Sequence, residues 1–295
     1  MLEFRKIMLS DKEHIELFLK KSNYRGCEYT FGNNFVWSKA FNVEICFKDE
    51  FYICKQGRGA DTRFIYPAGN GSVKTAVDLL LRYTAENKLP LKIIANKKNA
   101  EKITELYPNA GSTLNRDFCD YVYTAEDLAE LKGKKYHGKR NHLNRFYENN
   151  WSLEPLCIDN IADCKEMLKL WADENLNGDD DAGKLAELYV VELSLEHYNE
   201  LGYTGGVLRV DGKVSAFTFG EPSSDDCFVV HVEKALREHQ GAYAAINREF
   251  VKSLNGKYKY INREEDTGSE NLRKAKLSYH PVFLEEKFVI EFNGN

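Results

Sequence analysis

Short apolar runs and polar turns follow one another through the last third of the chain. The predicted elements are strands at 206–210, 214–219 and 227–232, a helix from about 242 to 254, and a short strand at 258–261. Asp211 and Gly212 separate the first two runs, and this pair is typical of a two-residue hairpin turn. The segment therefore predicts a hairpin, a third strand, a helix and a fourth strand, in that order.

The first half of the chain repeats this order. The predicted elements there are strands at 43–47, 51–55 and 63–66, a helix at 72–87, a strand at 91–95, a helix at 99–106, and a closing strand at 118–123. Two halves with the same order indicate an old duplication. Because the order resembles the core of the GNAT acyltransferase superfamily, we expect an α+β fold: a tandem GNAT-like duplication with two mixed sheets flanked by helices.

The segment between the halves sets the predicted domain boundary. A short helix is predicted at 125–131, and a strongly basic helix at 132–149 follows it. We therefore expect an N-terminal GNAT-like domain at 1–130 and a C-terminal one at 131–295, which begins with the basic helix. Since no low-complexity linker separates the halves, we expect them to pack tightly, with the basic helix bridging both.

Composition and charge restrict the class of protein. The formal net charge of -5 gives no general attraction to nucleic acid or to an anionic membrane, so any such contact requires a local patch. No apolar stretch has the length of a spanning helix, and no signal core follows Met1, so we expect a cytoplasmic protein without a transmembrane segment. The 7 cysteines include no C-x-x-C pair, which favours free thiols over a metal site.

The basic helix is a cationic segment in a chain that is acidic overall. Its apolar side chains can face the protein while the cations extend outward, which would attract a phosphate-bearing ligand. The alternative is a solvated helix face that balances acidic neighbours. The candidate phosphate-binding or tRNA-binding residues here are Lys135, His137, Lys139, Arg140, Asn144 and Arg145.

His231 and Glu233 are the candidate catalytic residues. Because side chains alternate along a strand, the two are predicted to share one face while Val230 and Val232 take the other. A histidine and a glutamate directed together suit a general base and its orienting partner. The alternative is a structural pair near the edge of the sheet.

A polar cluster follows the last predicted strand. Ligands of open sheets gather outside the carboxyl ends of strands, so this cluster could bind an amine, position a metal, or only cap the next helix. The candidate substrate-binding residues are Asn262, Arg263, Glu264, Glu265, Asp266, Tyr279 and His280. Arg273, Lys274 and Lys276 could neutralise these acids or hold a phosphate. The equivalent positions of the first half offer no carboxylate or histidine, so we expect one site, in the C-terminal sheet under the basic helix.

Several segments together resemble a known family. They are Lys139 to Arg145, Gly205 to Phe217, His231 to Ala235, Ile261 to Asp266, and Leu272 to Pro281. With these segments the chain is similar to the C-terminal domain family of phosphatidylglycerol lysyltransferase, in its stand-alone branch, and more distantly to the Fem-type aminoacyltransferases. The resemblance implies transfer of an amino acid from aminoacyl-tRNA to an amine or hydroxyl of a lipid head group or peptide.

The resemblance also indicates the donor. Acetyl-CoA enzymes of the wider superfamily need glycines at the start of the helix at 242–254, where backbone N–H groups approach a pyrophosphate. Tyr243 stands at the central glycine position, which favours aminoacyl-tRNA over acyl-CoA and implies no bound cofactor. The membrane half of the lysyltransferase has no counterpart in the sequence, so a soluble acceptor, or transient contact with a membrane surface, is expected. The alternatives are an acyl-CoA-dependent N-acyltransferase and a non-catalytic module that binds phosphate or nucleic acid. The oligomeric state stays open.

Overall fold

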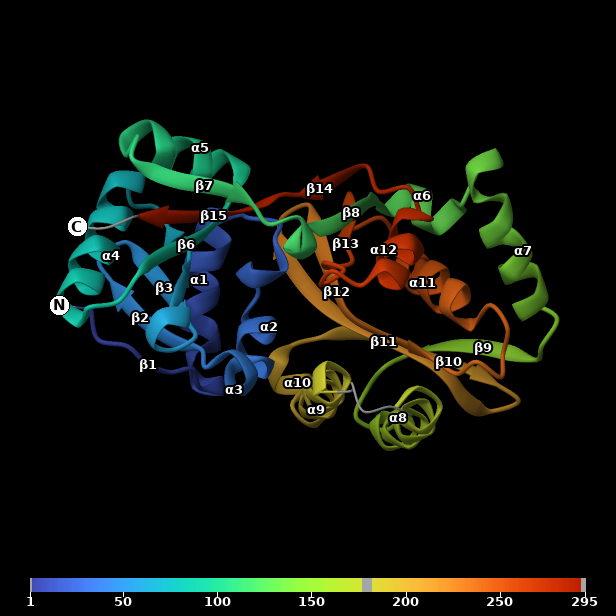
Figure 1. Ribbon diagram of the computed structural model, residues 1–295. Helices are drawn as coiled ribbons and strands as arrows, with labels where there is room; N and C mark the ends of the chain where they lie inside the picture. Colours follow the sequence, from blue (N-terminus) through green and yellow to red (C-terminus); the bar gives the residue numbers. More distant parts are fainter. Residues whose placement is uncertain (1, 177–181, 293–295) are drawn as a thin grey trace.

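Two mixed β-sheets, one toward each end of an elongated molecule, organise the fold (Figure 1). The computed structural model describes residues 2–176 and 182–292. The first sheet has the order β1-β2-β3-β4-β6-β15-β7, with β5 paired to β3, and the second has the order β14-β8-β13-β12-β11-β10-β9. The strands are β1 (Arg5–Lys6), β2 (Glu44–Lys48), β3 (Phe51–Gln56), β4 (Arg63–Ile65), β5 (Ala68–Gly69), β6 (Leu91–Asn96), β7 (Ala110–Leu114), β8 (Asp120–Thr124), β9 (Trp151–Pro155), β10 (Thr204–Val210), β11 (Lys213–Ser224), β12 (Cys227–Ala235), β13 (Tyr260–Asn262), β14 (Phe283–Glu285) and β15 (Lys287–Phe292).

Helices cover both sheets and fill the space between them (Figure 1). They are α1 (Lys12–Ser22), α2 (Phe31–Val36), α3 (Ser38–Phe41), α4 (Val73–Asn87), α5 (Lys97–Leu106), α6 (Ala125–Glu130), α7 (His137–Phe146), α8 (Ile161–Asn175), α9 (Ala182–Glu196), α10 (Tyr198–Leu201), α11 (Ala242–Ser253) and α12 (Glu270–Leu277). Short 3-10 turns include η2 (Cys27–Tyr29), η4 (Arg116–Phe118) and η5 (Lys134–Tyr136).

The predicted duplication is confirmed in the strand pairing. In the second half the antiparallel hairpin β10–β11 is followed by β12, helix α11 and β13, and β12 pairs with β13 in parallel. In the first half the hairpin β2–β3 is followed by β4, helix α4 and β6, and β4 pairs with β6 in parallel. Each half is thus an antiparallel hairpin followed by two parallel strands that a crossover helix connects, and the α+β fold class is confirmed.

Two strands lie in the sheet of the other half. The prediction that residues 118–123 close the first sheet is wrong, because β8 pairs with β13 and β14 in the second sheet. Its apolar residues Tyr121, Val122 and Tyr123 are fully buried there, which an interior strand of that sheet requires. The first sheet is instead completed by β15, which pairs with β6 and β7. The boundary near residue 130 stays a prediction, and both strands pair across it.

Three apolar clusters form the core. One packs α4 and α5 on the first sheet, and another packs α6, α7 and α11 on the second. The largest lies between the halves, where Ile45 and Tyr52 of the first sheet meet Phe217 and Phe219 of the second and Leu168 of α8. The halves therefore share a continuous apolar core, as the absence of a linker predicts.

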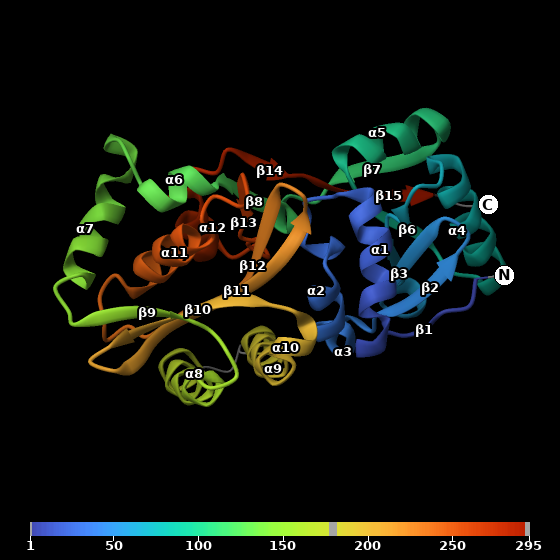
Figure 2. The ribbon, with the colours of Figure 1, turned by 180° about the vertical axis from the view of Figure 1, so that it is seen from behind.

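Helix α7 lies at the far end of the molecule. Figures 1 and 2 both place it at the end opposite the first sheet. The prediction that the basic helix bridges both halves is therefore wrong. Its apolar residues Tyr136, Leu143 and Phe146 are buried as expected, but in the cluster that also holds Phe250 of α11. This apolar face packs α7 into the core of the second sheet.

Candidate functional site

The candidate site lies where β12 and β13 separate. Only Cys227 to Val229 of β12 pair with Tyr260 to Asn262 of β13, and β12 then continues to Ala235 without this neighbour. Beyond Asn262 the chain stays beside β8, because the backbone N–H of Arg263 donates to the Tyr121 carbonyl. The two strands therefore diverge, and polar side chains from both occupy the opening.

A β-bulge places His231 and Glu233 on opposite faces of the sheet. Val230 lies opposite Gly220 and Val232 lies opposite Phe219, so His231 has no partner of its own on β11. Val230 consequently packs in the cluster under α11, whereas Val232 packs in the core between the halves. The prediction that His231 and Glu233 share one face is wrong, because the extra residue of the bulge shifts the alternation. Their predicted catalytic roles stay predictions.

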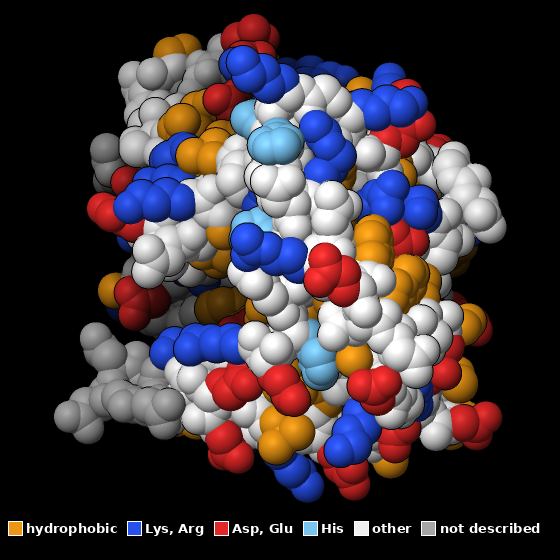
Figure 3. All heavy atoms as spheres, turned by 90° about the vertical axis from the view of Figure 1, so that its right-hand side faces the viewer, with side chains coloured by type: hydrophobic (Ala, Val, Ile, Leu, Met, Phe, Trp, Pro, Cys, Tyr) orange, Lys and Arg blue, Asp and Glu red, His pale blue; other side chains and the backbone are white. Residues whose placement is uncertain are grey.

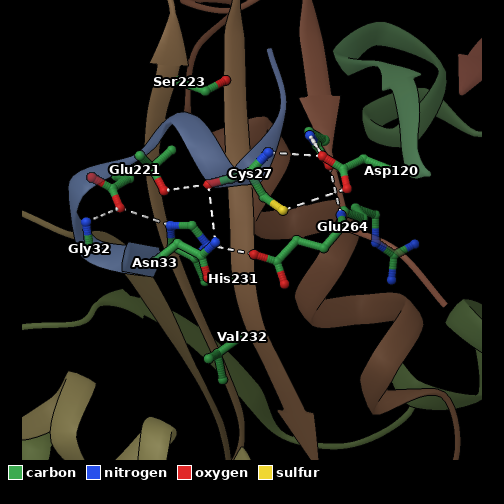
Figure 4. A network of polar contacts seen from close by, with 12 residues as sticks. Cys27, Gly32, Asn33, Asp120, Glu221, Ser223, His231, Val232 and Glu264 are labelled. Carbon is green, nitrogen blue, oxygen red and sulfur yellow. Dashed lines mark hydrogen bonds and ion pairs between the residues drawn. The ribbon is translucent and has the colours of Figure 1, made fainter. Parts of the chain in front are cut away.

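His231 lies between two carboxylates on the face toward the first half (Figure 4). Its Nε2 is 3.0 Å from Glu221 Oε1 and its Nδ1 is 2.7 Å from Glu264 Oε1. Burial alone would lower the pKa of His231, but the hydrogen bonds to Glu221 and Glu264 outweigh it and raise this pKa to about 10. The ring is therefore an imidazolium at neutral pH that donates from both nitrogens.

Helix α2 of the first half holds Glu221 in this position. The backbone N–H of Gly32, in α2, donates to Glu221 Oε1 over 2.9 Å. A Cβ at Gly32 would overlap the Tyr203 hydroxyl and Glu221, so only glycine allows α2 to approach this closely. The Tyr203 hydroxyl is buried and has no hydrogen-bond partner among residues 2–176 and 182–292.

The backbone that carries Glu264 is held in an unusual conformation. Glu264 has a φ of 57°, in the left-handed region that residues other than glycine rarely adopt. Asn262 Oδ1 accepts from the backbone N–H of Glu264 over 2.7 Å, and Lys276 Nζ donates to the carbonyls of Arg263 and Glu265. Burial lowers the pKa of Lys276. Lys276 is thus a half-buried anchor of this turn rather than a surface phosphate ligand.

Glu233 forms a separate charged layer on the face toward α11. Its carboxylate accepts from Arg263 Nη2 over 2.8 Å and from Asn247 Nδ2 over 3.0 Å. Lys139 covers this layer, with its Nζ 3.8 Å from the centre of the Tyr279 ring. Burial and the positive charge of Arg263 lower the pKa of Lys139 to about 8. The expectation that Lys139 extends outward is therefore wrong.

A buried lysine joins both sheets next to the His231 layer. Lys287 Nζ of β15 lies 2.6 Å from Asp120 Oδ1 of β8 and 2.9 Å from Glu28 Oε2 of η2. Cys27 Sγ is 3.3 Å from the same ammonium. Cys27, Glu28 and Asp120 have atoms close enough to share a metal ion, but Lys287 already supplies the cation among them. Asn262 Nδ2 donates to Asp120 over 2.8 Å and so ties this cluster to the opening.

Carboxylates outnumber cations around Lys287. Burial, reinforced by Asp120, raises the pKa of Glu265 to about 7. Burial and the nearby Glu28 raise the pKa of Glu285 to about 7 as well. Both groups are therefore partly protonated at neutral pH, which relieves the repulsion between the acids.

Asp266 is occupied by structural contacts. Arg273 donates to both oxygens of Asp266 over 2.8 Å, and the Tyr121 hydroxyl donates to it over 2.5 Å. The hydrogen bonds from Arg273, followed by those from Tyr121 and the Gly268 backbone, hold the pKa of Asp266 well below its ordinary value. Arg273 also pairs with Asp117 of η4 over 2.6 Å. These contacts fasten α12 to η4. They also use most of the N–H donors of Arg273, so few of these donors remain for a phosphate.

The cations of α7 differ in what they can reach. Arg140 turns back to the carbonyls of Leu131 and Gly133, over 2.6 Å and 2.7 Å, and so closes the end of α6. The remaining candidates of this surface are exposed: Lys135, His137, Asn144, Arg145, Lys274 and His280. Figure 3 shows this end of the molecule, where lysine, arginine and histidine side chains lie with acidic side chains among them. The cationic surface is therefore smaller than the sequence predicts.

A surface groove lies away from both charged layers. It has a volume of about 780 Å³ and lies between α6 and α11, with Ala129, Val251 and Tyr258 among its lining residues. None of the residues of the His231 or Glu233 layers lines it. Three of the cations that line it are paired: Arg248 and Lys252 with Glu249, and Lys132 with Glu130.

The sequence predictions missed five residues that complete the site: Glu28, Asp120, Glu221, Asn247 and Lys287. One of them, Asp120, carried a signal of its own, and a second signal, Gly220, lies next to Glu221. Asp120 is a single acid within an apolar run, and Gly220 inside a strand is typical of a bulge that reorients its neighbours. The others are brought together only by contacts between distant parts of the chain.

Comparison with known proteins places the chain in a family. Residues 19–291 match the family described as phosphatidylglycerol lysyltransferase, C-terminal. The chain belongs to this family. It is 37% identical to a conserved protein of unknown function from Bacteroides thetaiotaomicron VPI-5482, with a TM-score of 0.94 over 99% of this chain and 100% of that chain.

Two solved structures of low sequence identity share the fold, and one curated protein is similar in sequence. L-PGS from Bacillus licheniformis has 13% identity and a TM-score of 0.68, with 97% of this chain and 93% of that chain covered. FemX has 9% identity and a TM-score of 0.63, with 98% and 96% covered. An uncharacterised protein of Mycoplasmoides gallisepticum is 20% identical over 174 residues, which span 58% of this chain and 56% of that relative. Among the described residues, every helix is too short or too polar to cross a bilayer.

Proposed function

We propose that the protein is an aminoacyltransferase, which moves an amino acid from aminoacyl-tRNA to an amine or hydroxyl acceptor. The observation that carries the proposal is the opening between β12 and β13, lined by two charged layers, in a chain that belongs to the family of phosphatidylglycerol lysyltransferase C-terminal domains. Relatives of the same fold include L-PGS and FemX, whose likeness here extends to the fold alone. The acceptor, a lipid head group or a peptide, is part of the proposal.

The charges at the opening suit this chemistry. Acyl transfer to an amine needs a group that removes a proton and an environment that stabilises developing negative charge. Carboxylates of Glu233 and Glu264 lie on the two faces of the opening, and Arg263 and the His231 imidazolium accompany them. Because acids exceed cations around Lys287, a substrate that carries an ammonium group would be favoured there.

The exposed residues of α7 are the proposed tRNA surface. His137 and Arg145 are exposed and form no ion pair with any of residues 2–176 and 182–292, so they can approach phosphates. Phosphate contacts release counterions, so binding should weaken steeply with salt. We expect His137→Ala/Arg145→Ala to weaken tRNA binding in 50 mM salt. Lys74→Ala, on α4 at the other end of the molecule, is the matched control, because Lys74 pairs only on the surface with Asp78.

Acyl-CoA is a weaker donor candidate. The start of α11, where a pyrophosphate would bind, is crowded: a Cβ at Gly241 would overlap the His142 carbonyl of α7. Tyr243 follows there, with its hydroxyl accepting from Trp171 Nε1 over 3.0 Å. Close approach of a pyrophosphate to these N–H groups would require α7 to move.

The deciding experiment follows label from each of the twenty aminoacyl-tRNAs into acceptors of a cell extract. We expect transfer from at least one tRNA, and loss of that transfer in Glu233→Gln, measured at a temperature at which the variant remains folded. Glu238→Gln, an exposed residue just beyond β12, is the control and should keep full activity. Parallel titrations with acetyl-CoA and longer acyl-CoAs test the second donor.

Each outcome separates the alternatives. Transfer from acyl-CoA without transfer from tRNA would replace the donor. Binding of tRNA with no transfer from either donor would favour the non-catalytic module. Equal activity of Glu233→Gln and Glu238→Gln would remove the charged layer under α11 from the mechanism.

A further inference from the structure

We propose that Glu264 is the proton acceptor of the reaction and that His231 is its positioning residue. This assignment rests on the proposed aminoacyl transfer. It reverses the roles expected for a histidine beside a carboxylate, in which the ring takes the proton and the acid orients it. The geometry of the two hydrogen bonds of His231 carries the assignment.

His231 has no nitrogen left to accept a proton. Both ring nitrogens lie within 3.0 Å of a carboxylate oxygen, Glu221 on one side and Glu264 on the other. A carboxylate accepts and does not donate, so each contact requires a proton on the ring nitrogen. The side chain is also only 8% exposed, which leaves little of the ring for a substrate to reach.

Glu264 has the free acceptor that His231 lacks. One oxygen, Oε1, accepts from His231, and the other has no partner among residues 2–176 and 182–292 (Figure 4). Its side chain is 22% exposed, compared with 6% for Glu221. Glu264 is therefore the member of this layer that a substrate can reach.

Hydrogen bonds fix the backbone of the turn that carries Glu264. A glutamate at a φ of 57° is strained relative to an ordinary backbone, and such strain persists only where the surroundings impose it. Here Asn262 binds the backbone N–H of Glu264, and Lys276 binds the carbonyls on both sides of it. His231 then fixes the carboxylate. Two charged or polar side chains thus hold the backbone and a third holds the acid.

The titratable groups that face this pair come from several elements. They are Glu221 of β11, Tyr203 before β10, Cys27 of η2, Glu265 beside Glu264, and Lys276 of α12. The two carboxylates on His231 keep the ring charged, so its protonation should not change across neutral pH. The pH dependence of the reaction near neutral pH should then not report on His231.

The step balances without a further reactant. The acceptor nitrogen attacks the ester carbonyl, a C–N bond forms, and the bond from the carbonyl carbon to the ribose oxygen breaks. Glu264 takes the proton from the attacking nitrogen and returns it to the ribose oxygen, which leaves as a hydroxyl. The products are an amide and uncharged tRNA, and the carboxylate is regenerated.

The first test measures transfer as a function of pH. We expect Glu264→Gln to lower kcat by about 10²–10⁴-fold and Glu264→Asp to recover part of this loss. His231→Gln should lower kcat but keep the shape of the pH profile, because the acid remains. Glu270→Gln, an exposed residue of α12, should leave the activity unchanged. A profile with an inflection near pH 6.5 that vanishes in His231→Gln would make the histidine the base and overturn the assignment.

The second test needs no activity. Nitrogen NMR of the His231 ring should show both nitrogens protonated at pH 7.5, with a midpoint several pH units above that of a free histidine. In Glu264→Gln this midpoint should fall. A neutral ring at pH 7.5 overturns the assignment whatever the activity. If no tRNA supports transfer, the proposed function fails, while the NMR result still decides which of the two groups has a free acceptor.

Discussion

Replacing Lys287 by methionine should destabilise the protein more than any surface charge can. The side chains of Lys287, Asp120 and Glu28 are 7%, 0% and 9% exposed, and the ammonium lies within 2.9 Å of both acids. Methionine fills a similar volume but leaves two carboxylates buried without a cation. Removing one partner of a buried pair in this way costs about 3–5 kcal/mol.

The change can be read from a thermal melt. For a domain of this size, 1 kcal/mol corresponds to about 2 °C, so the Tm should fall by about 6–10 °C. Lys92→Met is the matched control, because Lys92 pairs with Glu291 between the neighbouring strands β6 and β15 but is 38% exposed. That surface pair contributes at most about 1 kcal/mol. The loss in Lys287→Met should also be smaller at pH 5 than at pH 8, since a freed carboxylate can then take up a proton.

Similar melting of the two variants would refute this reasoning. It would mean that Asp120 and Glu28 reach water or another cation when the lysine is gone. A loss of equal size at pH 5 and pH 8 would contradict the electrostatic origin, because it would show that packing rather than charge is lost.

Two further predictions concern the acids and His231. Burial raises the pKa of Glu265 and of Glu285 from 4.5 to about 7, so the folded protein binds these protons more tightly and its stability should fall as the pH rises from 4.5 to 7. The raised pKa of His231 adds a further fall between pH 6.5 and about 10, and urea unfolding at several pH values measures both. Double-mutant cycles of stability test which residues act together. The interaction energy between His231→Gln and Glu264→Gln should exceed about 1 kcal/mol, whereas the effects of His231→Gln and Glu233→Gln should be additive to within about 0.5 kcal/mol. A larger interaction energy for His231 with Glu233 than with Glu264 would contradict the two separate layers.

The duplicated fold follows from local patterns that the sequence contains. The hairpin at Asp211 and Gly212, the apolar run of β12 and the period of α11 are each encoded within a few residues. The placement of β8 is not encoded locally, because it depends on which of the two sheets has strands available to pair with it. An apolar run such as Tyr121 to Tyr123 fits the interior of either sheet, so its pattern alone cannot choose.

The candidate site was predicted less completely for the same reason. His231 and Glu233 were recognised by type, but their assignment to one face used the regular alternation that the bulge opposite Gly220 interrupts. Lys287 and Asp120 are 167 residues apart, and no spacing rule connects them. Cations of α7 were expected at the surface because lysine and arginine usually lie there, yet Lys139 covers a buried tyrosine.

The segment after β13 shows why a polar run need not be one site. Five consecutive residues contact five different partners: Asn262 binds Asp120, Arg263 binds Glu233, Glu264 binds His231, Glu265 lies by Cys27, and Asp266 binds Arg273. Successive side chains of an extended chain point in opposite directions, and the positive φ of Glu264 turns the chain once more. The run therefore joins the Lys287 cluster, both layers of the opening and the start of α12. A substitution that shifts its backbone, such as the loss of Lys276, acts on all of them together, whereas a change at one side chain acts on one.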